Sequence, residues 1–176
     1  QWDFKKQVGL NTGGTSGIGL ATARMVLSAG ASVLLVGRSQ TKGDHAIEAL
    51  SAFRDAVCFF RADVSKVLQC EKVIQKVQDQ FGSLDIVVNS AGVFRSSFID
   101  SVTEQEFDRI MDTNVKGTFF ICKYAIPLLK KSSHPAIINI SSDAGLHGNR
   151  QCPDYCASKG AVTLLTKALA LDLALD

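Results

Sequence analysis

Short apolar runs alternate with amphipathic stretches along the whole chain. The apolar runs predict strands at residues 8–12, 32–36, 57–62, 84–89 and 136–140. The amphipathic stretches predict helices at 17–29, 41–53, 66–81, from about 104 toward 129, and 152–175. Because helices and strands alternate and the strands are almost continuously apolar, we predict an α/β fold. Its sheet would be parallel and doubly wound, of the Rossmann type, with helices on both faces.

Local signals support several of these helix boundaries. Gly30 and Gly82 follow the first and third predicted helices, where glycine is favoured. Thr103 and Glu106 have the spacing of a capping box, which predicts a helix start there. Pro153 suits the first turn of the last predicted helix.

Composition and charge exclude several classes of function. The chain has 176 residues, of which 46% are hydrophobic and 20% charged, so we expect one domain, residues 1–176, with a buried core. Its 19 Lys and Arg residues nearly balance 17 Asp and Glu, which argues against nucleic-acid binding. The longest uncharged stretch, 7–23, is too rich in Gly and Thr to span a membrane. Since no apolar secretory segment precedes it, we expect a cytoplasmic protein.

The five cysteines do not form a recognisable framework. Their number is odd and no CxxC pair occurs, so we expect neither a set of disulfides nor a metal site. Cys152 and Cys156 are four residues apart on a predicted helix, a spacing that suits two metal ligands. No His or Cys that would complete such a site lies near them in the sequence, which favours two small buried residues instead.

A glycine-rich segment, Thr12 to Gly19, lies between the first predicted strand and helix. It reads TGxxxGxG, and it does not match GxGxxG because Thr22 stands at the third position. Glycines there allow backbone N–H groups to approach a phosphate at a helix N-terminus, although an ordinary turn is the alternative. The candidate cofactor-binding residues of this loop are Gly13, Thr15, Ser16, Gly17, Ile18 and Gly19.

The glycine loop and five further motifs, in their order along the chain, resemble the short-chain dehydrogenase/reductase family. The further motifs are Asp63-Val64, Asn89-Ser-Ala-Gly92, Asn114 in NVKG, Ser142 in SDAG, and Tyr155-Cys-Ala-Ser-Lys159. Ser142 lies thirteen residues before Tyr155. The resemblance implies cofactor contacts from Asp63, Val64, Asn89, Ala91, Gly92, Tyr155 and Lys159.

Tyr155 and Lys159 have the chemistry of a proton-transfer pair. They are four residues apart on a predicted helix, so their side chains share one face. A free phenol titrates near pH 10, and a neighbouring ammonium favours its ionised form. Tyr155 would then be the general acid in carbonyl reduction and the general base in alcohol oxidation. Ser142 would hydrogen-bond the substrate oxygen. The resemblance implies that Lys159 also holds the nicotinamide ribose and that Asn114 anchors a water.

The end of the second predicted strand bears on the choice of cofactor. NAD-binding proteins usually place Asp or Glu there, to accept a hydrogen bond from the ribose 2′-OH. This chain has Gly37 followed by Arg38, with Ser39 and Lys42 close behind. A guanidinium can pair with the 2′-phosphate of NADP, so we expect NADP, with NAD as second choice. A solvated Arg38 is the alternative, and Ser16 stands where many NADP-binding members carry a cation.

Departures from the family pattern leave other functions open. Asn11 occupies an apolar strand position, and Ser90 replaces the commoner second Asn. Family members continue beyond the Tyr155 helix into two more strands and a substrate-covering segment, whereas this sequence stops at Asp176. We therefore expect a C-terminally truncated chain whose strand 136–140 forms an open apolar edge.

The leading interpretation is an oxidoreductase acting on a small carbonyl or secondary alcohol. By resemblance it would be a homodimer or homotetramer. Residues 91–97, His147 and Asn149 would border the substrate cleft. The first alternative is a nucleotide-binding or oligomerisation module without turnover, because the substrate segment is absent. The second is an epimerase or dehydratase with bound cofactor, which the glycine spacing disfavours.

Overall fold

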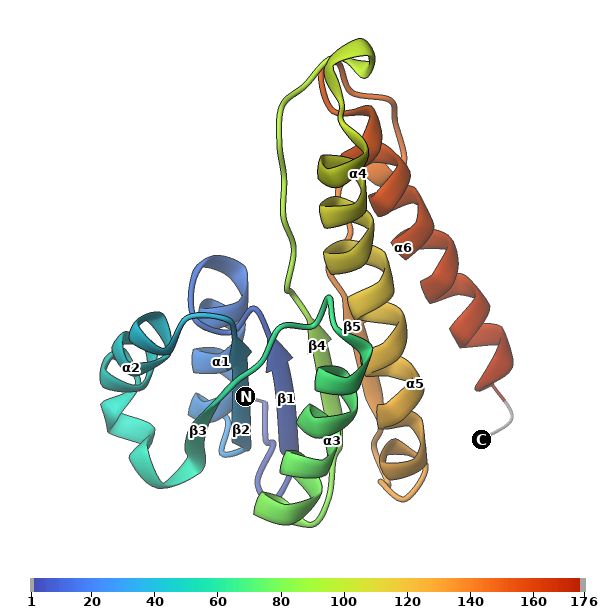
Figure 1. Cartoon of the computed structure of the whole chain (residues 1–176). Coiled ribbons are helices and arrows are strands. Elements are labelled where there is room, and N and C mark those ends of the chain that lie inside the picture. The colour runs from blue at the N-terminus through green and yellow to red at the C-terminus, as the bar shows by residue number, and fades with distance from the viewer. Residues whose placement is uncertain (1, 175–176) are drawn as a thin grey trace.

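The structure, a computed structural model, describes residues 2–174 and is built on one parallel sheet (Figure 1). The sheet has the order β3-β2-β1-β4-β5. Its strands are β1 (Val8–Thr12), β2 (Ser32–Gly37), β3 (Val57–Arg61), β4 (Ile86–Asn89) and β5 (Ala136–Asn139). The predicted doubly wound α/β fold is therefore confirmed. The strand order changes direction between β1 and β4, and in such sheets a crevice opens there at the carboxyl ends of the strands.

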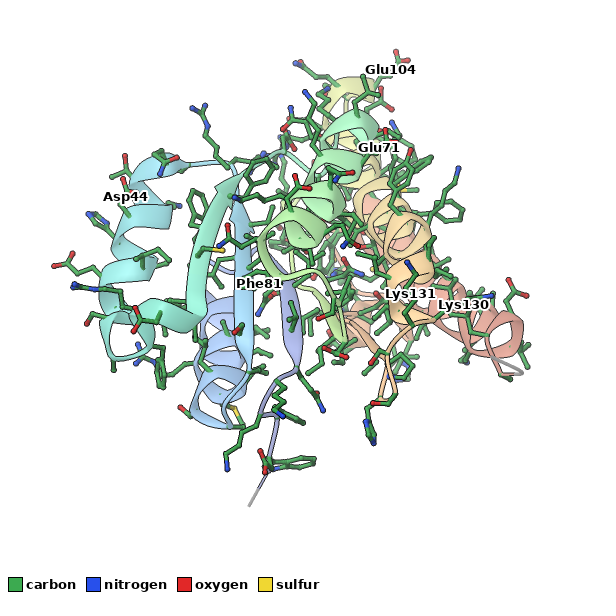
Figure 2. The ribbon with its side chains drawn as sticks, turned by 90° about the horizontal axis from the view of Figure 1, so that it is seen from below. Asp44, Glu71, Phe81, Glu104, Lys130 and Lys131 are labelled. Carbon is green, nitrogen blue, oxygen red and sulfur yellow. The ribbon has the colours of Figure 1, made fainter. Side chains whose placement is uncertain are left out.

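Helices cover both faces of the sheet (Figure 1). On one face pack α1 (Gly17–Ser28) and α2 (Gln40–Ala49), and on the other α3 (Val67–Phe81) and α5 (Gly117–Leu129). The view from below shows Asp44 of α2 and Glu71 of α3 pointing outward from these two layers (Figure 2). The last helix, α6 (Pro153–Asp172), packs beside α4 (Glu104–Met111) and next to β5.

The alternation of side chains along the central strands builds two cores. On β2, Leu34 is fully buried in the core beneath α3 and α5, while its neighbour Leu35 is fully buried in the core beneath α1 and α2. Both faces of the strand are thus apolar, which explains the continuous apolar run in the sequence. At the sheet edge the pattern weakens, and Ile138 of β5 is half-exposed.

Two of the predicted helices differ from the observed ones. The helix expected at 41–53 ends at Ala49, and a 3₁₀ helix follows at Ser51–Ala56. A 3₁₀ turn repeats every three residues, so Leu50 and Phe53 continue the same apolar stripe and the sequence pattern does not reveal the break.

The helix expected from 104 toward 129 is divided by a π-helical segment, η3 (Asp112–Lys116), between α4 and α5. The extra residue in this turn directs Thr113 and Asn114 into the protein, where both are buried. The capping box at Thr103 and Glu106 is confirmed, and Pro153 starts α6 as predicted. The last helix, predicted over 152–175, ends at Asp172, and its predicted last residue, Leu175, lies outside the described residues.

Candidate active site

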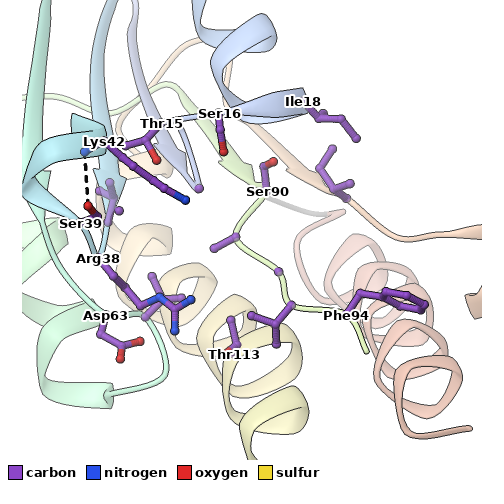
Figure 3. A pocket seen from close by; sticks show the side chains of 18 of the residues that line it. Thr15, Ser16, Ile18, Arg38, Ser39, Lys42, Asp63, Ser90, Phe94 and Thr113 are labelled. Atoms are coloured by element: carbon purple, nitrogen blue, oxygen red, sulfur yellow. Dashed lines mark hydrogen bonds between the residues drawn. The ribbon is translucent and has the colours of Figure 1, made fainter. Parts of the chain in front are cut away.

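A cavity of about 730 Å³ opens at the carboxyl ends of the strands (Figure 3). Residues from every predicted motif except Asn114-Val-Lys-Gly117 line it, although the motifs lie up to about 140 positions apart in the sequence. The predicted site residues among them are Gly13, Thr15, Ser16, Ile18, Arg38, Ser39, Asp63, Val64, Ala91, Gly92, Ser142, Tyr155 and Lys159. Gly17, Gly19, Asn89 and Asn114 do not line it. Gly17 has φ +52° and is the first residue of α1, between the lining residues Ser16 and Ile18.

The glycine loop is closed by two backbone contacts that exclude side chains. Gly13 has φ +66°, and a Cβ there would lie 2.7 Å from the backbone nitrogen of Ala91. A Cβ on Gly19 would lie 2.3 Å from the carbonyl oxygen of Gly13. The loop can therefore bring the N-terminus of α1 to the cavity, where N–H groups and the helix dipole favour a phosphate. Gly19 supports the loop from behind rather than lining the cavity.

Asn11 connects the loop to the sheet from below. Its polar side chain is buried, and its Nδ2 donates a hydrogen bond to the carbonyl oxygen of Gly19 at 2.8 Å. Its Oδ1 is buried without a hydrogen-bond partner among the described residues. The departure from the family pattern thus stabilises the first turn of α1.

Two cations face the cavity near the end of β2. Figure 3 shows the side chains of Arg38 and Lys42 extending into it, and neither forms an ion pair within residues 2–174. A Cβ on Gly37 would lie 2.9 Å from Cγ2 of Thr15, so the position where NAD-binding proteins carry a carboxylate is filled by Thr15. The Ser39 hydroxyl caps α2 by accepting from the Lys42 N–H at 3.3 Å.

Asn114 joins the segment after β4 to the last helix. Its Oδ1 accepts from the N–H of Val93 at 2.8 Å, and its Nδ2 donates to the carbonyl of Val93 at 2.9 Å. The same Nδ2 lies 3.0 Å from Oγ of Ser158, which is next to Lys159 on α6. Asn114 therefore holds two walls of the cavity together without lining it.

Tyr155 and Lys159 lie together on the cavity face of α6. The Lys159 Nζ is 5.7 Å from the centroid of the Tyr155 ring and donates to the carbonyl oxygen of Ile140 at 2.6 Å. The side chain of Lys159 is only 6% exposed, and its burial lowers the pKa of the ammonium. Phe94 meets the Tyr155 ring edge to face, with centroids 5.0 Å apart. An apolar ring thus covers one side of the tyrosine, beside a cation that can stabilise a phenolate.

Ser142 lies across the cavity in an extended conformation before a 3₁₀ turn, η4 (Asp143–Gly145). Its hydroxyl donates to Oδ1 of Asp143 at 2.7 Å, and its Oγ accepts from the N–H of Ala144 at 3.2 Å. The hydrogen bonds from Ser142, Ala144 and Asn149, together with the charge of His147, lower the pKa of Asp143. The hydroxyl must turn away from this carboxylate in order to donate to a substrate oxygen.

Gly145 sets the distance between the Ser142 turn and α6. A Cβ at this position would lie 2.6 Å from the carbonyl oxygen of Lys159. We expect Gly145→Ala to destabilise the fold by about 1–3 kcal/mol, since backbone atoms must move to admit the methyl group. Thermal unfolding would show this as a fall in Tm of about 2–4 °C per kcal/mol. Gly148→Ala, in open space three residues further along, is the matched control, and equal Tm values for both variants would contradict the prediction.

Other residues lie differently from what the sequence indicates. Asn89, expected to touch cofactor, donates from Nδ2 to Asn139 at 2.9 Å and to Sγ of Cys122 at 3.2 Å, beneath the cavity floor. His147 and Asn149, expected at the substrate cleft, are absent from the cavity lining. The lining residues that the motifs miss are Val36, Gly37, Ala62, Thr113, Ile140 and Ser141, and Ser90 lines the cavity from within the 89–92 motif although it was not a candidate. Most of them end a strand or directly follow one. A place at the carboxyl end of a predicted strand is the sequence signal that could have identified them.

The described residues offer no group of three or more His, Cys, Asp or Glu that could hold a metal ion. Across residues 2–174, no helix is both long enough and apolar enough to cross a bilayer. The fold and the cavity define an α/β protein with a glycine-rich loop at a helix N-terminus and a tyrosine–lysine pair at one site.

The comparisons with known proteins identify the family. A family sequence profile described as short chain dehydrogenase matches residues 7–176. The chain therefore belongs to the short-chain dehydrogenase family of oxidoreductases. An uncharacterized oxidoreductase of Thermotoga maritima is 39% identical over 171 residues, which cover 97% of this chain and 67% of that protein. A 3beta-hydroxysteroid dehydrogenase of Mediterraneibacter gnavus is 35% identical, over 97% of this chain and 62% of that protein.

A solved structure agrees with this assignment. It is described as a short-chain dehydrogenase/reductase, glucose/ribitol dehydrogenase, from Brucella melitensis, and it superposes with a TM-score of 0.94 at 28% identity. The match covers 99% of this chain and 72% of that one. The chain thus spans between 62% and 72% of the length of these three relatives. The family as a whole uses a nicotinamide dinucleotide, and the glycine loop and the cavity fit such a group.

Proposed function

We propose that this protein transfers a hydride between NADP(H) and a carbonyl or secondary alcohol substrate, as an oxidoreductase of the EC 1.1.1 type. One observation carries the proposal: a single cavity is lined both by the cations Arg38 and Lys42 and by Ser142, Tyr155 and Lys159. Figure 3 shows the two cations well apart from Phe94, whose ring contacts that of Tyr155. An extended dinucleotide would place its ribose phosphate at the cations and its reactive ring at the tyrosine. The bound nicotinamide would supply or accept the hydride.

The residues of the chain would handle the proton and the oxygen. Tyr155 donates its phenolic proton to the substrate oxygen in reduction and recovers it in oxidation. Lys159, held by the carbonyl of Ile140, keeps its positive charge beside the ring and stabilises the phenolate left behind. Ser142 turns its hydroxyl from Asp143 toward the developing oxyanion. Phe94, on the edge of the Tyr155 ring, keeps water from one side of the reacting atoms.

A turnover assay against a panel of aldehydes and ketones tests this function directly. We expect NADPH oxidation that depends on the carbonyl, with NADH giving a smaller kcat/KM. Cofactor affinity measured on the same preparation separates the alternatives, because a nucleotide-binding module without turnover would bind NADPH and reduce nothing. Protein that binds neither dinucleotide would contradict both proposals.

We propose that the working assembly is a homodimer or homotetramer. Phe107 of α4 and Phe119 of α5 are 42% and 46% exposed, and such apolar side chains on neighbouring helices favour burial against a second copy. Sedimentation equilibrium would give the mass in solution, and a monomer at micromolar concentration would reject the assembly.

A further inference from the structure

A pair of cysteines lies at the start of α6, on either side of Tyr155 in the sequence. The Cys152 and Cys156 sulfur atoms are 3.8 Å apart. Cys152 is the N-cap of the helix and only 5% exposed, whereas Cys156, in the first turn, is half-buried and open to small molecules. No other two of the five cysteines are in contact, and all five lie within the described residues.

The surroundings of the pair allow the two sulfur atoms to approach further. Residues four apart on a helix have Cβ atoms about 5–6 Å apart, whereas a disulfide needs about 3.5–4.5 Å. Cys152 has φ −158° and ψ 51°, outside the helical region, so it is not fixed to the helical path. The preceding Gln151 has φ +61°, a left-handed conformation that is unfavourable for a residue with a side chain. The loop end that carries Cys152 can therefore move relative to the helix.

The pair is also connected to both proposed catalytic side chains. Tyr155 is the residue before Cys156 and lies within the segment that a disulfide would tighten. The backbone N–H of Asn149 lies 3.4 Å from Sγ of Cys156, and its side-chain Nδ2 lies 3.5 Å from Oδ2 of Asp143. Asp143 in turn accepts a hydrogen bond from the hydroxyl of Ser142. A shift of the first turn of α6 thus reaches Tyr155 directly and Ser142 through these three contacts.

We propose that Cys152 and Cys156 are an oxidisable dithiol, which a hydroperoxide closes to a disulfide and a thiol reductant reopens. The Cys156 thiolate attacks the peroxide, giving a sulfenic acid and releasing an alcohol or water. The Cys152 sulfur then attacks the sulfenic sulfur, forming the S–S bond and releasing water. In sum, two thiols lose two electrons and two protons to the peroxide bond, which is cleaved.

Closure would draw the first turn of α6 together and displace Tyr155 from its position beside Lys159. A misplacement of about 1 Å can cost a hundredfold in rate, so we expect turnover to fall at least about tenfold. Because the bond closes a short and strained loop, it should be among the readily reduced, labile disulfides. This link to turnover rests on the proposed function, whereas the chemistry of the pair does not.

Peptide mass spectrometry of the whole protein after treatment with hydrogen peroxide tests the site. Trypsin places the pair in one peptide, 151–159, and the other three cysteines in separate peptides, 55–61, 67–72 and 117–123. We expect 151–159 to lose the mass of two hydrogen atoms and to regain it with dithiothreitol. Burial raises the pKa of Cys58, and that of Cys70 and Cys122 to about 11, and none of the three contacts a second thiol, so they should remain reduced. Burial also raises the pKa of Cys152, which is consistent with Cys156 being the thiol that attacks the peroxide.

Turnover measured on the same samples tests the link to Tyr155. Cys152→Ala and Cys156→Ser should each abolish both the mass loss and the reversible inhibition, while Cys58→Ser should preserve both. A 151–159 peptide that keeps its mass, or that gains oxygen at Cys156 without the bond, would overturn the dithiol. A disulfide that leaves turnover unchanged would overturn its coupling to Tyr155. Because the peptide mass is measured without substrate, it tests for the disulfide even if the protein shows no turnover.

Discussion

Tyr155→Phe should lower turnover by at least about a hundredfold while leaving cofactor affinity close to that of the unaltered protein. The substitution removes only the phenolic hydroxyl. The ring that meets Phe94 edge to face, with centroids 5.0 Å apart, remains in place. Lys159 keeps its bond to the carbonyl of Ile140, since that contact does not involve the tyrosine. The loss should therefore fall on kcat rather than on binding or folding.

The other tyrosine of the chain, Tyr124, provides a matched control. Tyr124 lies on α5, away from the cavity, with its ring 6.0 Å from that of Phe120. Tyr124→Phe makes the same chemical change and should leave kcat within about twofold. Steady-state kinetics and a cofactor titration on both variants test whether the Tyr155 hydroxyl contributes to kcat and not to cofactor binding. Near-normal turnover in folded Tyr155→Phe protein would remove Tyr155 from the proton-transfer role.

The central sheet was predictable because its strands are buried on both faces. Leu34 and Leu35 enter opposite cores, so the sequence shows an unbroken apolar run with glycine-rich turns at its ends. Helix interruptions were not predictable in the same way. Leu50 and Phe53 keep an apolar spacing of three that α- and 3₁₀ helices share, and the π segment at Asn114 leaves the apolar stripe on both sides intact.

The candidate site, too, has features that could be predicted from the sequence and others that could not. Residues in ordered motifs, such as Gly13 and Tyr155, could be assigned because each motif has its own chemistry and place beside a strand or helix. The contacts that orient them were not available from the sequence. Asn114 holds Val93 and Ser158 across 21 and 44 positions, and the bond from Ser142 to its neighbour Asp143 depends on a side-chain rotamer. The contacts of Asn114 join residues that meet only once the chain has folded.

Arg38 gives the second large expected effect, on cofactor choice. Its guanidinium is exposed at the cavity, points inward and is free of ion pairs within residues 2–174, so it can pair with the 2′-phosphate that distinguishes NADP from NAD. Removing a charge-assisted pair of this kind costs about 1.5–3 kcal/mol, or roughly 10- to 150-fold in Kd. Arg38→Ala should therefore weaken NADP binding by that factor and leave NAD binding almost unchanged.

Two further variants sharpen the test of Arg38. Lys42→Ala should weaken NADP binding less, because an ammonium on a flexible stem acts as a point charge without the bidentate geometry of a guanidinium. Arg54→Ala removes an equal charge from an exposed position outside the cavity and should change neither affinity. Isothermal titration with both dinucleotides at one fixed ionic strength provides the comparison, since the pairing is screened by salt. An equal loss of affinity for NADP and NAD in Arg38→Ala would contradict the pairing of Arg38 with the 2′-phosphate. Tighter binding of NAD than of NADP by the unaltered protein would contradict the expected cofactor preference.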